Sequence, residues 1–163
     1  MIDAETRALS IRVLEACRAR RWLVATAESC TGGLVAGALT EIAGSSDVVD
    51  RGFVTYSNAA KMALLGVPEA TLAAHGAVSQ ATAEAMALGA LARAGVDLTV
   101  AITGVAGPGG GSAEKPVGLV HFAAAAKDGR LIHREKRYGD VGRSEVRRLS
   151  VIEALIMMLE LAA

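Results

Sequence analysis

Residues 22–43, which read WLVATAESCTGGLVAGALTEIA, decide the fold of this chain. The apolar run over residues 22–27 has the length of a strand, and TAESCTGG (residues 26–33) leads from it into a helix predicted from about residue 31 to 43. Gly44 follows, and glycine is the residue that most often ends a helix. The stretch therefore predicts a strand, a tight turn and a helix in that order.

The remaining elements are predicted from apolar periodicity, helix caps and turn residues. Asp128-Gly129 is typical of a hairpin turn between the last two strands. Because the first three strands alternate with helices and the last two form a hairpin, the sequence predicts an α/β fold. It is a three-layer α/β/α sandwich with a mixed, mostly parallel five-stranded sheet. The other predicted elements are helices over about 4–20, 59–65, 67–74, 79–94 and 142–161, and strands over about 52–57, 97–103, 117–126 and 130–138.

The composition limits what the chain does. A length of 163 residues is typical of one domain, expected here over residues 1–163. Seventeen basic and seventeen acidic residues cancel, so the chain lacks the general attraction that nucleic-acid or anionic-membrane binders carry. Hydrophobic residues make up 52% of the chain but aromatic residues only 3%, which predicts a closely packed aliphatic core. We expect no nucleic-acid and no membrane partner.

Targeting and metal signals are missing from the sequence. No apolar run approaches the ~20 residues of a membrane span, and MIDAETRALS (residues 1–10) lacks an export pattern, so we expect a soluble cytoplasmic protein. Two cysteines, Cys17 and Cys30, are too few for a disulfide framework. The three histidines show no ligand spacing, and no metal or other cofactor is expected.

The last helix carries two apolar stripes. Such a pattern indicates burial on two sides, and it predicts a homodimer or a higher homo-oligomer. The first stripe comprises Val146, Leu149, Ile152, Ile156 and Leu159, and the second comprises Val151, Leu155 and Met158.

Three loops follow the carboxyl ends of the first three strands, and in an open parallel sheet those ends meet at the edge where ligands bind. In the first loop, Ser29 is either a nucleophile or simply part of a helix cap. In the second loop, Lys61 lies five residues after Tyr56, so both side chains are candidates for the same cleft. A partly desolvated lysine acts as a base near neutral pH, whereas a solvated Lys61 would have no such role.

The third loop, GVAGPGGGSAEKP (residues 104–116), is rich in glycine, which permits close approach of a ligand to the backbone. It matches neither the Walker motif nor the dinucleotide-binding fingerprint. The loop is either a mobile connection or a ligand-binding segment, and its length favours the second interpretation.

Four ordered blocks, AESCTGG, EIAGSSDVVDRGFVTYSNAAK, HGAVS and AITGVAGPGGGSAEKPVGLV, closely resemble the C-terminal domain of the competence/damage-inducible protein CinA. Stand-alone members of that family are nicotinamide mononucleotide deamidases. The resemblance implies a serine amidohydrolase that converts nicotinamide mononucleotide and water to nicotinate mononucleotide and ammonia, in pyridine-nucleotide (NAD) salvage. It also implies that Ser29 and Lys61 form a Ser–Lys dyad beside Tyr56.

On this basis we expect Lys61 to take the proton of Ser29 and Tyr56 to orient Lys61 or relay a proton. The alternative is a nucleotide-binding regulatory or interaction domain without turnover. The residues expected to bind substrate, either through the oxyanion or through the ribose and phosphate, are Cys30, Thr31, Gly32, Gly33, Ser45, Ser46, Thr103, Gly104, Gly107, Gly109, Gly110, Gly111 and Ser112.

Overall fold

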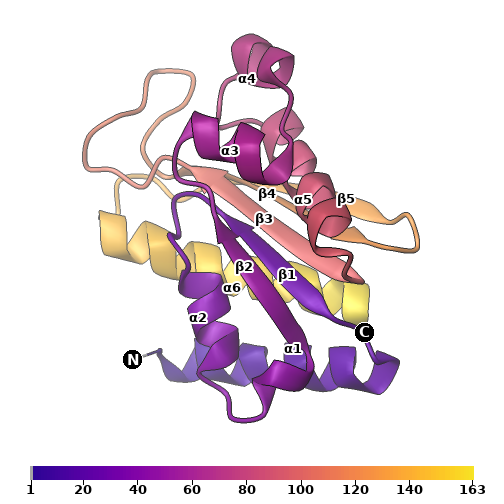
Figure 1. Ribbon diagram of the computed structural model, residues 1–163. Coiled ribbons are helices and arrows are strands. Elements are labelled where there is room, and N and C mark those ends of the chain that lie inside the picture. Colours follow the sequence, from indigo (N-terminus) through magenta and orange to yellow (C-terminus); the bar gives the residue numbers. More distant parts are fainter. Residues whose placement is uncertain (1) are drawn as a thin grey trace.

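Five strands form one mixed sheet in the order β2-β1-β3-β4-β5 (Figure 1). The computed structural model describes residues 2–163. Strand β1 is parallel to β2 and β3, whereas β4 is antiparallel to both β3 and β5. The predicted α/β fold with its mixed five-stranded sheet is therefore confirmed. The strands are β1 (Val24–Glu28), β2 (Val49–Val54), β3 (Leu98–Gly104), β4 (Leu119–Ala126) and β5 (Leu131–Arg137).

Helices cover both faces of the sheet, which gives the predicted three layers (Figure 1). Helices α1, α2 and α6 lie on one face, and α3, α4 and α5 lie on the other. A short 3₁₀ helix over Ser45–Asp47 precedes β2. The α-helices are α1 (Ala4–Arg20), α2 (Leu34–Thr40), α3 (Asn58–Leu65), α4 (Glu69–His75), α5 (Gln80–Ala94) and α6 (Arg143–Ala162).

The two faces of the sheet have different cores. The α1/α2/α6 face buries larger side chains, among them Leu98, Ile102 and Phe122. The α5 face is built largely from alanine, because Ala-rich α5 packs close to the sheet. Small residues at such an interface let a helix approach the strands closely. This second core also includes Leu65, the last residue of α3, and therefore fixes the helix that carries Lys61.

Helix α2 begins three residues later than predicted, and two glycines are the reason. Gly32 and Gly33 have φ values of 58° and 100°, in the left-handed region that residues with a side chain rarely adopt. The turn after β1 therefore extends to Gly33. Strand β2 in turn begins at Val49, before the predicted residue 52, where the 3₁₀ helix ends.

The second apolar stripe of α6 is buried within this chain, whereas Ile156 of the first stripe is exposed. The helix packs against α1 and α2 as well as against β3 and β4, and Val151, Leu155 and Met158 are buried there. The second stripe is therefore covered without another subunit, and the homo-oligomer stays a prediction. Within residues 2–163, no helix combines the length and apolarity needed to cross a membrane.

Candidate active site

The turn after β1 presents Ser29 at the edge where three strands end. Glu28, the last residue of β1, pairs with Val54 of β2 and Ile102 of β3, so the loops that follow these strands begin side by side. The Ser29 N–H donates to the Ile102 carbonyl at 2.9 Å, and the side chain is 8% exposed. Ser29 is thus fixed by the sheet and still borders a cavity.

A buried carboxylate, Glu28, holds the start of α2 in place. One oxygen accepts from the Thr31 hydroxyl at 2.7 Å and from the Val35 N–H at 2.9 Å. The other accepts from the Thr26 hydroxyl at 3.2 Å and the Ala36 N–H at 3.0 Å. Glu28 therefore uses N–H groups of the first turn of α2 that an external phosphate would otherwise bind. The capping function that the sequence left open belongs to Glu28 rather than to Ser29.

Lys61 reaches Ser29 from the opposite side of the cavity. Its Nζ lies 3.1 Å from the Ser29 Oγ and donates to the Thr55 carbonyl at 3.0 Å. Ser57 caps α3 by accepting from the Ala60 N–H, and this sets the position of Lys61 in the first turn of the helix. The side chain is 1% exposed, so the solvated interpretation of Lys61 is wrong.

Burial also sets the protonation chemistry of this pair. Desolvation disfavours the ammonium form and lowers the pKa of Lys61 below the ordinary lysine value. Among residues 2–163, no carboxylate lies within ion-pair distance of its Nζ. Burial likewise raises the pKa of the neighbouring Cys30 thiol to about 12, which keeps it protonated. The 3.1 Å contact with Nζ makes Ser29 the side chain placed to give up a proton to the amine.

Tyr56 lies at the same cavity but does not contact Lys61 in the way expected from the sequence. Its side chain is 62% exposed, and its hydroxyl accepts from Nη2 of Arg143 at 3.0 Å. Arg143 Nη1 also donates to the Gly107 carbonyl at 2.8 Å, which ties the glycine-rich loop to α6. The contact that orients Lys61 comes instead from the carbonyl of Thr55, one residue earlier.

Ser29, Lys61, Tyr56 and Arg143 border one cavity of about 200 Å³. Thr103 and Gly104, at the end of β3, form part of its wall. The Thr103 hydroxyl donates to the Ala77 carbonyl at 2.7 Å and so holds the segment before α5 against the cavity. The other residues that line it are Cys30, Asn58, Ala77, Val78 and Ala106.

Three backbone N–H groups in the turn after β1 are unoccupied donors. Within the part of the chain that the structure describes, the N–H groups of Cys30, Thr31 and Gly33 have no protein acceptor. The Gly32 N–H, by contrast, donates to the Ser29 carbonyl at 3.0 Å. Free N–H groups beside a nucleophile are the donors that stabilise an oxyanion in acyl transfer.

The structure does not bring all the predicted substrate-binding residues to this cavity. Ser45 and Ser46 lie before the amino end of β2, whereas Ser29 follows the carboxyl end of the parallel strand β1, so we remove them from the set. The tip of the glycine-rich loop, residues 109–112, is exposed. The Ser112 N–H donates to the Lys115 carbonyl at 2.8 Å, so the loop closes on itself. None of residues 109–112 lines the cavity.

Two arginines in the first turns of α6, Arg143 and Arg147, were not among the site residues predicted from the sequence. Arg143 borders the cavity, and Arg147 donates from Nε to the Cys30 carbonyl at 3.1 Å and from Nη2 to the Thr31 carbonyl at 3.2 Å. Their spacing of four places both on one side of the helix. Cations near a helix N-terminus interact unfavourably with the helix dipole. Arginines in the first turns of a predicted helix are therefore the sequence signal that could have indicated a functional role.

Two histidines, His121 of β4 and His133 of β5, lie together away from this cavity. Their rings stack with centroids 5.2 Å apart, and Nδ1 of His121 lies 2.9 Å from Nε2 of His133. Burial and the neighbouring His133 lower the pKa of His121. In residues 2–163, His, Cys, Asp and Glu side chains form no group of three or more that would hold a metal ion.

Comparisons with known proteins show which family the chain belongs to. A family model described as the CinA C-terminal domain matches residues 6–162. The nicotinamide-nucleotide amidohydrolase PncC of Escherichia coli (strain K12) is 53% identical over 156 residues, which are 95% of this chain and 93% of that protein. PncC of Enterobacter agglomerans is 54% identical over 138 residues, covering 85% of this chain and 84% of that protein.

A longer relative and a crystal structure complete the comparison. The CinA-like protein of Synechococcus sp. (strain RCC307) is 54% identical over 156 residues, but these are only 37% of its length. The crystal structure of the competence/damage inducible protein CihA from Agrobacterium tumefaciens has 55% identity and a TM-score of 0.98, covering 100% of this chain and 99% of that one. From the fold, the sequence and these matches, the chain belongs to the CinA C-terminal domain family.

Proposed function

We propose that this chain is a nicotinamide-nucleotide amidohydrolase, which converts nicotinamide mononucleotide and water to nicotinate mononucleotide and ammonia. The observation that carries the proposal is the 3.1 Å contact between the Ser29 Oγ and the buried Nζ of Lys61. A hydroxyl paired with a desolvated amine is a nucleophile paired with its general base. The relatives named PncC, at 53–54% identity, support this substrate.

In the first half-reaction, the neutral amine of Lys61 takes the proton of the Ser29 hydroxyl as the Oγ attacks the carboxamide carbon. The carboxamide oxygen becomes an oxyanion, and the free N–H groups of Cys30 and Thr31 are the donors proposed to stabilise it. Lys61 then gives its proton to the leaving amide nitrogen. The carbon–nitrogen bond breaks, ammonia leaves, and an ester to Ser29 remains.

In the second half-reaction, Lys61 takes a proton from water, which attacks the ester carbon. The ester bond breaks, and the Ser29 oxygen recovers a proton from Lys61. Nicotinate mononucleotide leaves and the enzyme returns to its starting state. Each proton that Lys61 takes is returned within the same half-reaction, so the steps balance without a further reactant.

The cavity also suggests how the nucleotide is held. We place the nicotinamide ring beside Ser29, within the cavity of about 200 Å³. The ribose and phosphate then extend toward the rim, where Arg143 supplies a cation and the hydroxyl of Tyr56 lies 3.0 Å from it. Guanidinium groups are well suited to bind phosphate. We therefore place Tyr56 in substrate contact, together with Thr103 and Gly104. Gly107 does not line the cavity and instead accepts from Arg143 through its carbonyl.

Release of ammonia from nicotinamide mononucleotide, compared with free nicotinamide, tests this function. We expect turnover of the nucleotide and little or none of the free amide, because free nicotinamide lacks the phosphate that Arg143 would bind. Binding of the mononucleotide without ammonia release would instead support the non-catalytic alternative. A role in pyridine-nucleotide salvage, the single domain over residues 1–163, a cytoplasmic location and a homo-oligomer remain predictions.

A further inference from the structure

Arg147 makes a contact that the reaction steps above do not use. Although it lies on α6, its guanidinium donates to two consecutive carbonyls of the turn that carries Ser29, at distances of 3.1 and 3.2 Å. These contacts join positions more than one hundred residues apart in the chain. They are the direct side-chain link between α6 and the turn over residues 29–32, which we call the nucleophile turn.

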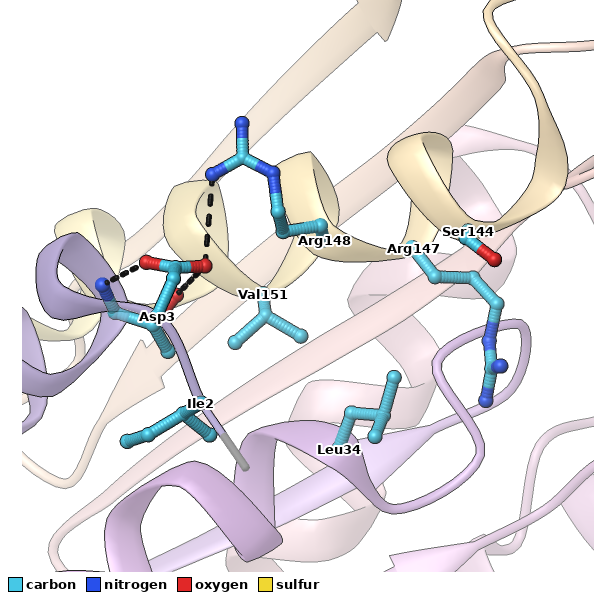
Figure 2. Close-up of a pocket in the computed structure, with 8 residues that line it drawn as sticks. Ile2, Asp3, Leu34, Ser144, Arg147, Arg148 and Val151 are labelled. Carbon is cyan, nitrogen blue, oxygen red and sulfur yellow. Dashed lines mark hydrogen bonds and ion pairs between the residues drawn. The ribbon is translucent and has the colours of Figure 1, made fainter.

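The neighbouring Arg148 shows how different this arrangement is. Arg148 pairs with Glu145 at 2.9 Å and lies 3.5 Å from Asp3, whereas no carboxylate within the described residues lies in ion-pair distance of Arg147. Figure 2 shows the two side chains leaving α6 in different directions, with Arg148 beside Asp3 and Arg147 pointing away from it. Among the described residues, the hydrogen-bond partners of the Arg147 guanidinium are the two carbonyls of the nucleophile turn.

The geometry of the peptide bond explains what this contact does. In a trans peptide the C=O and the following N–H point in opposite directions. Holding the Cys30 carbonyl toward Arg147 therefore turns the Thr31 N–H away from α6, and that N–H has no protein acceptor among the described residues. A cation at the carbonyl end of the peptide also polarises it, which makes the N–H a stronger donor.

The nucleophile turn is shaped to accept this arginine. Gly32 has a φ of 58°, and a Cβ on it would lie 3.3 Å from Nη2 of Arg147. A side chain at residue 32 would therefore strain the backbone and press on the guanidinium at the same time. Glycine at this position serves both the turn and its contact with α6.

We propose that Arg147 is a positioning residue for the proposed amidohydrolase reaction. It holds the nucleophile turn in the form in which the Thr31 N–H serves the oxyanion. The inference rests on the proposed function, because it assigns an oxyanion to this turn. Since Arg147 makes no contact with the carboxamide in this arrangement, its loss lowers kcat and leaves KM nearly unchanged.

A second cavity offers a specific way to test this role. It has a volume of about 400 Å³, is lined by Arg147 and Arg148 together with Leu34, Ser144 and Val151, and lies between α1, α2 and α6 (Figure 2). In Arg147→Ala the space of the lost side chain joins this cavity. A small planar cation added to the solution then has a route to the Cys30 and Thr31 carbonyls.

The experiment compares Arg147→Ala with Arg148→Ala, a control that removes an arginine from the same cavity but not from the nucleophile turn. For Arg147→Ala we expect kcat to fall about 100-fold, the scale of one lost oxyanion donor, with KM within about threefold of wild type. Guanidinium chloride at tens of millimolar restores at least a tenth of the lost rate, and sodium chloride at the same ionic strength does not. Arg148→Ala stays within about threefold of wild type.

Several outcomes would overturn the inference. They are a kcat of Arg147→Ala within threefold of wild type, a loss confined to KM, or equal effects of the two salts. If Arg147→Ala does not fold by circular dichroism, Arg147→Lys carries the test. It keeps the charge without the two-point contact, so it should lower kcat at least fivefold, and a wild-type kcat would refute the positioning role.

The proposed function and this inference fail in different ways. Wild-type protein that releases no ammonia refutes the proposed function. The position of the turn is then measured by the rate at which a fluorophosphonate labels Ser29, since that reaction needs the same donors but no pyridine nucleotide. Slower labelling of Arg147→Ala than of wild type supports the inference, and equal labelling or none in either protein refutes it.

Discussion

Replacing Glu28 by glutamine tests whether this buried carboxylate organises the site. Each of its oxygens accepts one hydroxyl and one backbone N–H. Glutamine has a single oxygen, so one hydroxyl and one N–H come to face an NH₂ group. The hydroxyl can rotate and accept a hydrogen bond from that group, but the backbone N–H cannot. One N–H at the start of α2 therefore loses its acceptor.

The expected cost follows from these contacts. An unsatisfied N–H costs about 1–3 kcal/mol, and removal of a negative charge from a helix N-terminus costs about 0.3–2 kcal/mol. The free energy of unfolding should therefore fall by about 2–4 kcal/mol. For a chain of this size the melting temperature would fall by about 4–16 °C.

Thermal unfolding followed by circular dichroism measures this change. Glu41→Gln is the matched control, because Glu41 is an exposed carboxylate just after the other end of α2, and it should shift the free energy by less than about 0.5 kcal/mol. The reasoning is refuted if Glu28→Gln melts within 2 °C of wild type. It is equally refuted if both variants lose the same stability.

Two further predictions concern Lys61 and the helix that carries it. Burial lowers the pKa of Lys61 below the ordinary lysine value of 10.5, and only its neutral amine acts as the base. The kcat/KM should therefore rise with pH and level off below pH 10.5. A kcat/KM independent of pH from 6 to 10 would contradict this. Gly89→Ala should destabilise the protein by more than about 2 kcal/mol and lower turnover, because its Cβ would lie 1.9 Å from the carbonyl oxygen of Leu65 at the end of α3. The control is Gly37→Ala in α2, where a Cβ meets nothing within 4 Å, and it should raise the free energy of unfolding in urea by about 0.5–1 kcal/mol. Equal effects of the two substitutions would refute the packing argument.

Local patterns were sufficient to predict the fold. Helix α5 ends at Ala94 before Gly95, α3 ends at Leu65 before Gly66, and the hairpin turns around Asp128 and Gly129, each close to the predicted place. Caps, turn glycines and apolar periodicity act within a few residues, so they are readable from the sequence. The errors lie at the start of α2, where Gly32 and Gly33 extend the turn, and at the start of β2, where Val49 already pairs with Val24 of β1.

The site was less predictable, because it is assembled by contacts between distant elements. That Ser29 and Lys61 meet follows from strand order, which the sequence suggested through three loops at one sheet edge. That Tyr56 meets Arg143 instead of Lys61 depends on where α6 crosses the sheet, and no local pattern contains this. The same crossing brings Arg147 to the nucleophile turn.

A double-mutant comparison tests the Ser–Lys dyad most directly. It measures the kcat for ammonia release from nicotinamide mononucleotide by Ser29→Ala, by Lys61→Met and by the double variant. Residues that act as one unit lose activity together, so each single variant should fall by at least 10³-fold and the double variant no further. Additive losses, or a Ser29→Ala variant within tenfold of wild type, would contradict a dyad in which Lys61 activates Ser29.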